Sequence, residues 1–245
     1  MKTLTQALEN NSTIYPSIRN SGEIYHSVSK TKYDFGNALK ALFSLDSLEG
    51  LHHACKDLDP FVNADLGRDS HSEYHKIFYR NIKIKNSPIR VLWERFCKEV
   101  VKNNFPDEQP LIIQALPNLR IQVPGALAVH RWHCDSDNDH RHPLGEINAI
   151  LAVTDMVGTN SVWRESSPNK GDFQPFKLSA SELVYWNGNT CIHGNKKNTT
   201  QQTRISLNFR VIPTSAYNKN VGNGSALESV TTSTKFKIGD YYHCI

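Results

Sequence analysis

The chain has 245 residues, with 28 Lys and Arg against 24 Asp and Glu and a net charge of +4. This length supports a sizeable core, and we expect one domain spanning residues 1–245. The basic residues are scattered and no long apolar run occurs, which argues against nucleic acid or a membrane as the partner. The N-terminal residues lack the apolar core of a signal peptide, and the five cysteines form no CxxC pair, so we expect a soluble, cytoplasmic protein with reduced thiols.

Residues 1–115 are predicted to be largely helical. In SPIRVLWERFCKEVV, Ser87 is a natural N-cap, Pro88 takes the first helical position, and apolar residues recur at three- and four-residue steps. Similar spacing predicts shorter helices in DFGNALKALFSL and SLEGLHHACKDL. We expect the apolar sides of these helices to pack on the outer face of a sheet, without a role in the chemistry.

Residues 117–213 show a period of two instead. Short strands are predicted at LRIQV, GALAVHRWHC, EINAILAVTD, SVWRES, PFKLS, ELVYW and RISLNFRVI. Many short strands separated by turns are typical of a sandwich or barrel. Residues 214–245 are expected to form a long polar loop and a tail that could dock on the core, with Tyr241 and Tyr242 acting either as a lid or as anchors.

The segment from His130 to Glu146, HRWHCDSDNDHRHPLGE, concentrates histidines and carboxylates. Its acidic residues fall at positions one, three, five and twelve of a calcium-binding loop. However, His140 stands where that loop requires Gly, Pro143 would stiffen its exit, and its flanks are predicted strands instead of helices. A calcium module is therefore the weaker interpretation.

The stronger interpretation begins with His133 and Asp135, which point to the same side if they lie on a strand. His193, after ELVYW and a turn, could bring a second imidazole from a distant strand. Two histidines and one carboxylate on one face of an iron leave its other face open. Ten residues separate His193 from Arg204, and Ser206 follows two positions later. A guanidinium with a neighbouring hydroxyl suits a small dicarboxylate.

The order of these residues along the chain resembles that of the Fe(II)/2-oxoglutarate-dependent oxygenase superfamily: His133, Asp135, His193, Arg204 and Ser206. Two longer motifs resemble a narrower branch, the StrG-like oxygenases of streptomycin-type biosynthetic clusters: GTNSVWRESS and HGNKKNTTQQTRISLNFRVIP. The resemblance covers the second half of the chain well and the helical half loosely. It implies an α+β, mainly β fold, in which N-terminal helices pack on the outer sheet of a double-stranded β-helix of the jelly-roll or cupin type.

The resemblance also implies a reaction. His133, Asp135 and His193 would hold Fe(II), and Arg204 with Ser206 would anchor the distal carboxylate of 2-oxoglutarate. With O2 as the further co-substrate, the enzyme would hydroxylate a small polar metabolite. Related radical halogenases have a small residue in place of the carboxylate, so Asp135 favours hydroxylation or another oxidation over halogenation.

Strand alternation adds candidates on the same inner row. If Arg204 and Ser206 face inward, so do Asn208 and Arg210. We expect Asn208 to help bind the co-substrate. Arg210 either binds substrate or pairs with a carboxylate at the barrel rim.

Three further residues are candidates for binding substrate. His130 could contact it directly, or only hydrogen-bond to a neighbour. Glu146 and Glu165 could lie at the mouth of the pocket and select a cationic amine or guanidinium, or could instead bridge to a nearby basic residue. His140 and His142 are interpreted as solvated turn residues.

A different class of function remains open, namely a metal-containing binding or isomerising protein on the same barrel. Arg204 favours the oxygenase, because a non-oxidative barrel needs no dicarboxylate anchor at that distance from the distal histidine.

Overall fold

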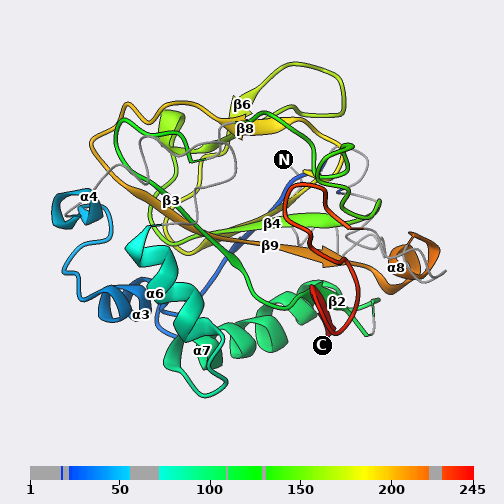
Figure 1. Cartoon of the computed structure of the whole chain (residues 1–245), viewed down its shortest axis with the longest axis horizontal. Coiled ribbons are helices and arrows are strands. Elements are labelled where there is room, and N and C mark those ends of the chain that lie inside the picture. Colours follow the sequence, from blue (N-terminus) through cyan, green and yellow to red (C-terminus); the bar gives the residue numbers. More distant parts are fainter. Residues whose placement is uncertain (1–17, 19–21, 56–71, 109, 129–130, 221–227) are drawn as a thin grey trace.

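The structure is a computed structural model that describes residues 18, 22–55, 72–108, 110–128, 131–220 and 228–245 (Figure 1). Its helical elements are α3 Phe35–Phe43, α4 Leu51–Ala54, α6 Glu73–Ile82, α7 Pro88–Phe96, the π-helical η1 Cys97–Val101, the 3-10 turns η2 Lys102–Asn104 and η3 Gly158–Asn160, and α8 Thr214–Asn220. Its strands are β1 Ile24–Ser27, β2 Ile112–Gln114, β3 Asn118–Gln122, β4 Ile147–Ala152, β5 Val162–Arg164, β6 Gln174–Pro175, β7 Glu182–Trp186, β8 His193–Asn195, β9 Arg204–Ile212 and β10 Tyr242–Cys244.

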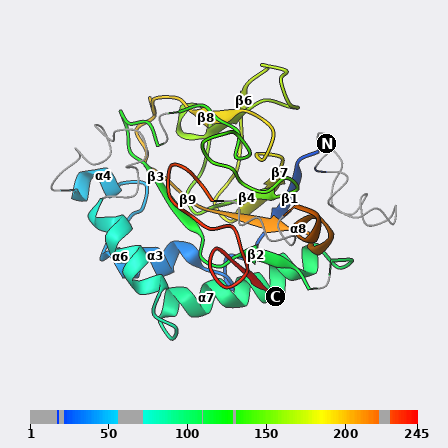
Figure 2. The same ribbon diagram turned by 45° about the vertical axis from the view of Figure 1, so that its right-hand side comes forward.

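Two antiparallel sheets and a layer of helices stack in the order small sheet, large sheet, helices (Figure 1), and the turned view in Figure 2 keeps that order. The large sheet has seven strands in the order β1-β7-β4-β9-β2-β10, with β3 also paired to β9. The small sheet has the order β6-β5-β8. The described part of the chain is therefore built mainly from antiparallel strands, with a few helices on one side.

The two faces of the large sheet have different partners. On β9, Ile205, Leu207, Phe209 and Val211 are fully buried in one cluster with the helices. Phe209 meets the ring of Trp93 on α7 edge-on, with ring centroids 5.1 Å apart. Alternate residues of β9 therefore face the small sheet, because successive side chains of a strand point to opposite sides. Packing of the helices on the outer face of a sheet is confirmed.

Local sequence explains where the helices begin. The side chain of Ser87 accepts a hydrogen bond from the amide of Arg90, and Pro88 opens α7, as predicted. Helix α6 was not predicted, although Ser72 caps it by accepting from the amide of His75. The helix predicted in SLEGLHHACKDL is a single turn, α4, within the described residues, and residues 56–58 lie outside them.

Two predictions for the β half need correction. GALAVHRWHC is not a strand: among its described residues, only His133 forms an isolated bridge. Gly125, at φ 82°, instead lies within a turn whose backbone bonds to Asn198, so the apolar alternation there reflects packing of an irregular segment. The polar loop after residue 213 contains α8. The tail docks on the core, because β10 pairs with β2.

None of the helices in the described ranges combines the length and the apolar composition needed to cross a bilayer.

Candidate metal centre

Three side chains from two distant segments of the chain converge between the two sheets. His133 and His193 exchange backbone hydrogen bonds of 3.0 and 2.8 Å, which puts the two imidazoles on one side of the bridge. The amide of Asp135 donates to the carbonyl of Gly188, which brings its carboxylate to the same point. The Nε2 atoms of His133 and His193 each lie 3.6 Å from Asp135 Oδ1. The three potential ligand atoms lie within 4.8 Å of one another, so one ion could contact all of them.

Backbone carbonyls fix the orientation of both imidazoles. The Nδ1 atoms of His133 and His193 lie 2.9 and 3.1 Å from the carbonyl oxygens of Arg131 and Cys191. A carbonyl only accepts, so each Nδ1 carries a proton and each Nε2 presents a lone pair when the ring is neutral. Burial lowers the pKa of His193 to about 3, which keeps that ring neutral at pH 7. Burial also opposes protonation of His133, but Asp135 outweighs it and raises its pKa.

The second carboxylate oxygen of Asp135 is fully engaged. Oδ2 accepts from Arg210 Nε at 3.0 Å, from Arg210 Nη2 at 2.7 Å and from Asn148 Nδ2 at 2.7 Å. Although burial alone would raise the pKa of Asp135, the Arg210 guanidinium holds it well below its usual range. Oδ1 is therefore the oxygen that faces the histidines. Of the two roles considered for Arg210, the structure shows the ion pair.

This donor set fits a divalent transition metal. Two imidazole nitrogens and one carboxylate oxygen on one side of an ion are typical of non-haem Fe(II) sites with open positions. Without a cation, the lone pair of the neutral His193 Nε2 would face a carboxylate oxygen of Asp135, which is an unfavourable pairing in a buried site. A bound cation would satisfy all three atoms at once.

A cavity borders the metal centre, and His133 and His193 are among the residues that line it. Ile150, Val162 and Trp186 give it an apolar wall, and its polar lining includes Asn148 and Asn208. Two buried polar atoms on this lining, Asn148 Oδ1 and Trp186 Nε1, have no hydrogen-bond partner. The cavity thus combines an apolar wall with polar groups to which a ligand could hydrogen-bond.

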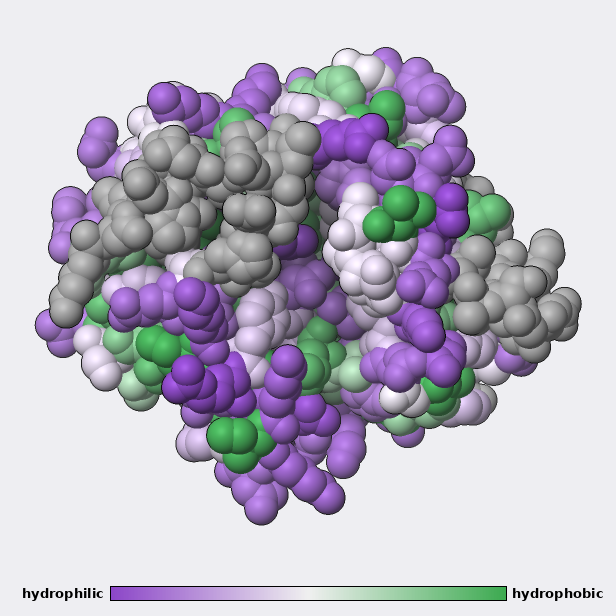
Figure 3. Space-filling model, in the orientation of Figure 1, coloured by the Kyte–Doolittle hydropathy of each residue, from purple (hydrophilic) through white to green (hydrophobic). Residues whose placement is uncertain are grey.

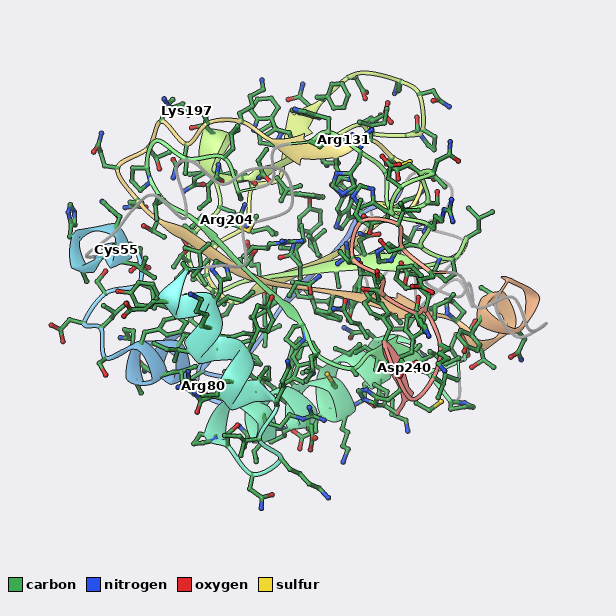
Figure 4. All side chains as sticks on the ribbon, in the orientation of Figure 1. Cys55, Arg80, Arg131, Lys197, Arg204 and Asp240 are labelled. Atoms are coloured by element: carbon green, nitrogen blue, oxygen red, sulfur yellow. The ribbon has the colours of Figure 1, made fainter. Side chains whose placement is uncertain are left out.

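The predicted co-substrate residues share the inner face of β9 with Arg210. Arg204 is 1% exposed, and Figure 4 shows it between the two sheets. Its guanidinium donates to Ser206 Oγ at 3.0 Å and to the carbonyl of Asn160 at 3.2 Å. Ser206 in turn donates to Asn208 Oδ1 at 2.7 Å. Asn208 lines the cavity described above, whereas Arg204 and Ser206 lie further along the strand.

Glu146 and Glu165 do not lie at the mouth of this cavity, contrary to expectation. Glu146 is 3% exposed and accepts hydrogen bonds from Tyr242 and from His142 Nδ1. Glu165 is 2% exposed and accepts from backbone amides, including that of Ile192 at 2.7 Å. Although burial opposes it, these amides lower the pKa of Glu165. Both carboxylates are buried, with little surface open to solvent.

The last substrate candidate, His130, lies outside the described residues.

The sequence analysis missed several residues around the centre. His140 stacks on the ring of His133, with centroids 4.2 Å apart, and its Nδ1 lies 2.8 Å from Asp137. The amide of His142 donates to the carbonyl of Asp135 at 2.9 Å. Tyr242 is an anchor instead of a lid, since it is 1% exposed.

Comparison with curated proteins gives a match over most of the chain. No family model matches the chain. Streptomycin biosynthesis protein StrG of Streptomyces griseus is 27% identical over 215 residues, which cover 88% of this chain and 94% of StrG.

Similarity to solved structures is weaker. The Ni complex of the non-haem monooxygenase ThoJ matches 80% of this chain and 76% of its own, at 14% identity and a TM-score of 0.43. AviO1 of Streptomyces viridochromogenes matches 82% and 93%, at 15% identity and a TM-score of 0.49. TM-scores this low do not establish a common fold. The resemblance expected from the motifs is confirmed at the level of sequence: the chain is similar to StrG over most of its length.

Proposed function

We propose that this chain is an Fe(II)- and 2-oxoglutarate-dependent oxygenase, built on a double-stranded β-helix, that hydroxylates a small polar metabolite. The observation that carries the proposal is the meeting of His133, Asp135 and His193 at one point beside a cavity. Similarity to a streptomycin biosynthesis protein supports a small polar substrate.

The residues around the centre would hold and orient the metal. Arg210 and Asn148 engage one oxygen of Asp135 and leave the other for the ion, and backbone carbonyls aim both histidines. Bound Fe(II), together with 2-oxoglutarate and O2, would supply the oxidising chemistry. The buried side chains of Trp186 and Val162 exclude water from the wall beside the ligands.

Arg204 and Ser206 support 2-oxoglutarate as the co-substrate. A buried guanidinium beside a hydroxyl matches a carboxylate that needs a charge-assisted pair and one further donor. Both face the space between the sheets from the strand that also carries Arg210.

The test is consumption of 2-oxoglutarate. With Fe(II) and O2, the purified protein should convert 2-oxoglutarate to succinate slowly even without substrate, and chelation of the metal should stop this turnover. His193→Ala should abolish it, Arg204→Gln should raise the concentration of 2-oxoglutarate required, and Arg80→Gln on α6 should leave it unchanged, because Figure 4 shows Arg80 among the helices, away from Arg204. A protein that binds metal through His193 but never consumes 2-oxoglutarate would favour the non-oxidative alternative.

A further inference from the structure

The C-terminal segment, residues 228–245, contacts the loop that carries one of the metal ligands. We propose that Tyr242 and Glu146 are positioning residues for Asp135, because they hold this ligand loop, residues 135–146, in the shape that binds the metal. Metal binding and docking of the C-terminal segment would then strengthen each other. The inference rests on the metal centre of the function proposed above, but not on the substrate or on any step of the reaction.

The C-terminal segment, red in Figure 1, extends from the large sheet to the ligand loop. Strand β10 pairs with β2, and near the other end of the segment the amide of Val230 donates to the carbonyl of Asp139 at 2.9 Å. The side chains of Phe236 and Tyr242 are buried, whereas the hydrophobic residues visible on the face in Figure 3 are scattered among hydrophilic ones. The segment therefore makes its main apolar contacts inward, with the rest of the described chain.

Glu146 joins the C-terminal segment to the ligand loop. Its side chain is buried, and one carboxylate oxygen accepts from the hydroxyl of Tyr242 while the other accepts from His142 Nδ1 at 2.6 Å. The ring of His142 packs on that of Phe236, with centroids 4.3 Å apart. A buried carboxylate depends on such donors, because burial limits the access of water that could replace a lost one. Removing the hydroxyl of Tyr242 would therefore leave one oxygen unpaired and weaken the constraint on His142.

His142 connects Glu146 to the metal ligand. Its amide donates to the carbonyl of Asp135 at 2.9 Å, so the backbone of His142 helps to fix the backbone of Asp135. The guanidinium of Arg210 contacts Asp135 Oδ2 at 2.7 Å and fixes the side chain. These two contacts together orient Oδ1, which lies 3.6 Å from both imidazoles. Residues that orient a metal ligand typically change the metal affinity by about 10–100-fold when they are mutated.

The side chains of Asp135, His142 and Glu146 also lie close together, with potential ligand atoms within 4.8 Å of one another. We do not assign a second metal to them, because both oxygens of Glu146 already accept hydrogen bonds and Arg210 engages Asp135 Oδ2. The carboxylate of Glu146 instead lies beside the metal ligand, where it adds to the attraction for a divalent cation.

Metal affinity tests the proposal on the intact protein. Calorimetric titration should show Mn(II) binding about tenfold more weakly to Tyr242→Phe than to the parent, the lower end of the usual range because Tyr242 acts through other residues. Glu146→Gln should weaken binding at least as much, since it also removes a charge. Tyr241→Phe is the matched control. It removes the neighbouring hydroxyl, which donates to Gln114 Oε1 at 2.9 Å on β2 and not to the ligand loop, so it should keep the parent affinity.

Hydrogen exchange measures the same coupling at the C-terminal segment. The factor by which docking strengthens metal binding is also the factor by which the metal strengthens docking. Saturating Mn(II) should therefore slow exchange about tenfold at the amides that join β10 and its flanks to β2, namely those of Leu111, Ala115 and Ile245. The slowing should be smaller in Tyr242→Phe, and amides of α3, among the helices on the other face of the large sheet, should change less.

Equal Mn(II) affinities of Tyr242→Phe and Tyr241→Phe, with circular dichroism that matches the parent, would overturn the proposal. Exchange at the β10–β2 amides that Mn(II) leaves unchanged in the parent would also overturn it, and this measurement decides the matter even if Tyr242→Phe does not fold. A parent protein that binds no Mn(II) would overturn both this proposal and the oxygenase. One that binds Mn(II) but never consumes 2-oxoglutarate would overturn only the oxygenase.

Discussion

Replacing Arg210 by Gln should destabilise the metal-free protein far more than replacing an exposed arginine. The side chains of Arg210 and Asp135 are 10% and 1% exposed, and two nitrogens of the guanidinium contact one carboxylate oxygen. Removing one partner leaves a buried carboxylate without its cation, which typically lowers the free energy of unfolding by about 3–5 kcal/mol. In a chain of this size, a loss of about 3 kcal/mol lowers the Tm by roughly 6–12 °C.

The chain offers a matched control in the ion pair between Arg131 and Asp139. Their side chains are 59% and 39% exposed, so water already solvates both charges. Arg131→Gln should therefore lower the free energy of unfolding by less than about 1 kcal/mol. The two variants remove the same chemical group from a carboxylate pair and differ mainly in burial.

The assay is urea unfolding followed by circular dichroism, with a chelator and again with saturating Mn(II). Saturating Mn(II) should reduce the loss of unfolding free energy caused by Arg210→Gln, because a metal on the other carboxylate oxygen of Asp135 would compensate the unpaired charge. Equal losses for Arg210→Gln and Arg131→Gln, or a deficit in Arg210→Gln that Mn(II) leaves unchanged, would refute this reasoning.

Further substitutions test the surroundings of the centre. Gly188→Ala should weaken Mn(II) binding, because an added Cβ would lie 2.6 Å from Asn148 Cγ. Calorimetry compares this variant with Gly36→Ala, whose Cβ would meet nothing closer than 3.6 Å. Equal Mn(II) affinities of the two variants would contradict the prediction. Glu165→Gln should lower the Tm at pH 7 and lower it less in acid. The reason is that the pKa of Glu165 is depressed in the folded protein, so its carboxylate stabilises the fold above the unfolded-state pKa of about 4.3 and this stabilisation is lost as the pH falls through the folded-state pKa. A Tm difference that does not change with pH would argue against this reasoning. Tyr242→Phe should lower the free energy of unfolding by about 1–3 kcal/mol, because it leaves a buried carboxylate oxygen without its donor; an unchanged urea midpoint would count against this role.

Strand β9 shows what the sequence could predict. Its bounds match the stretch RISLNFRVI, and its apolar residues are buried against the helices. Strand alternation has a period of two, so locating Arg204 on the inner face also located Asn208 and Arg210. The three convergent side chains of the metal centre were located by their characteristic spacing and not by this rule, because His133 forms only an isolated bridge and Asp135 lies in a turn.

Partners of buried polar groups could not be predicted in this way. Glu146 was expected at the mouth of the pocket, but its partner Tyr242 comes from the C-terminal strand, far away in sequence. Glu165 is held by backbone amides, which no side-chain pattern encodes. The apolar alternation in GALAVHRWHC imitated a strand, since a buried irregular segment can carry the same pattern.

The central claim, that His133, Asp135 and His193 bind one metal that also binds 2-oxoglutarate, is tested most directly by visible absorption under anaerobic conditions. Addition of one equivalent of Fe(II) and then 2-oxoglutarate should produce a charge-transfer band, which chelation of the metal by the co-substrate causes. His193→Ala should lose the band, and Arg204→Gln should need more 2-oxoglutarate to form it. No band in the parent protein, or an undiminished band in His193→Ala, would contradict the account.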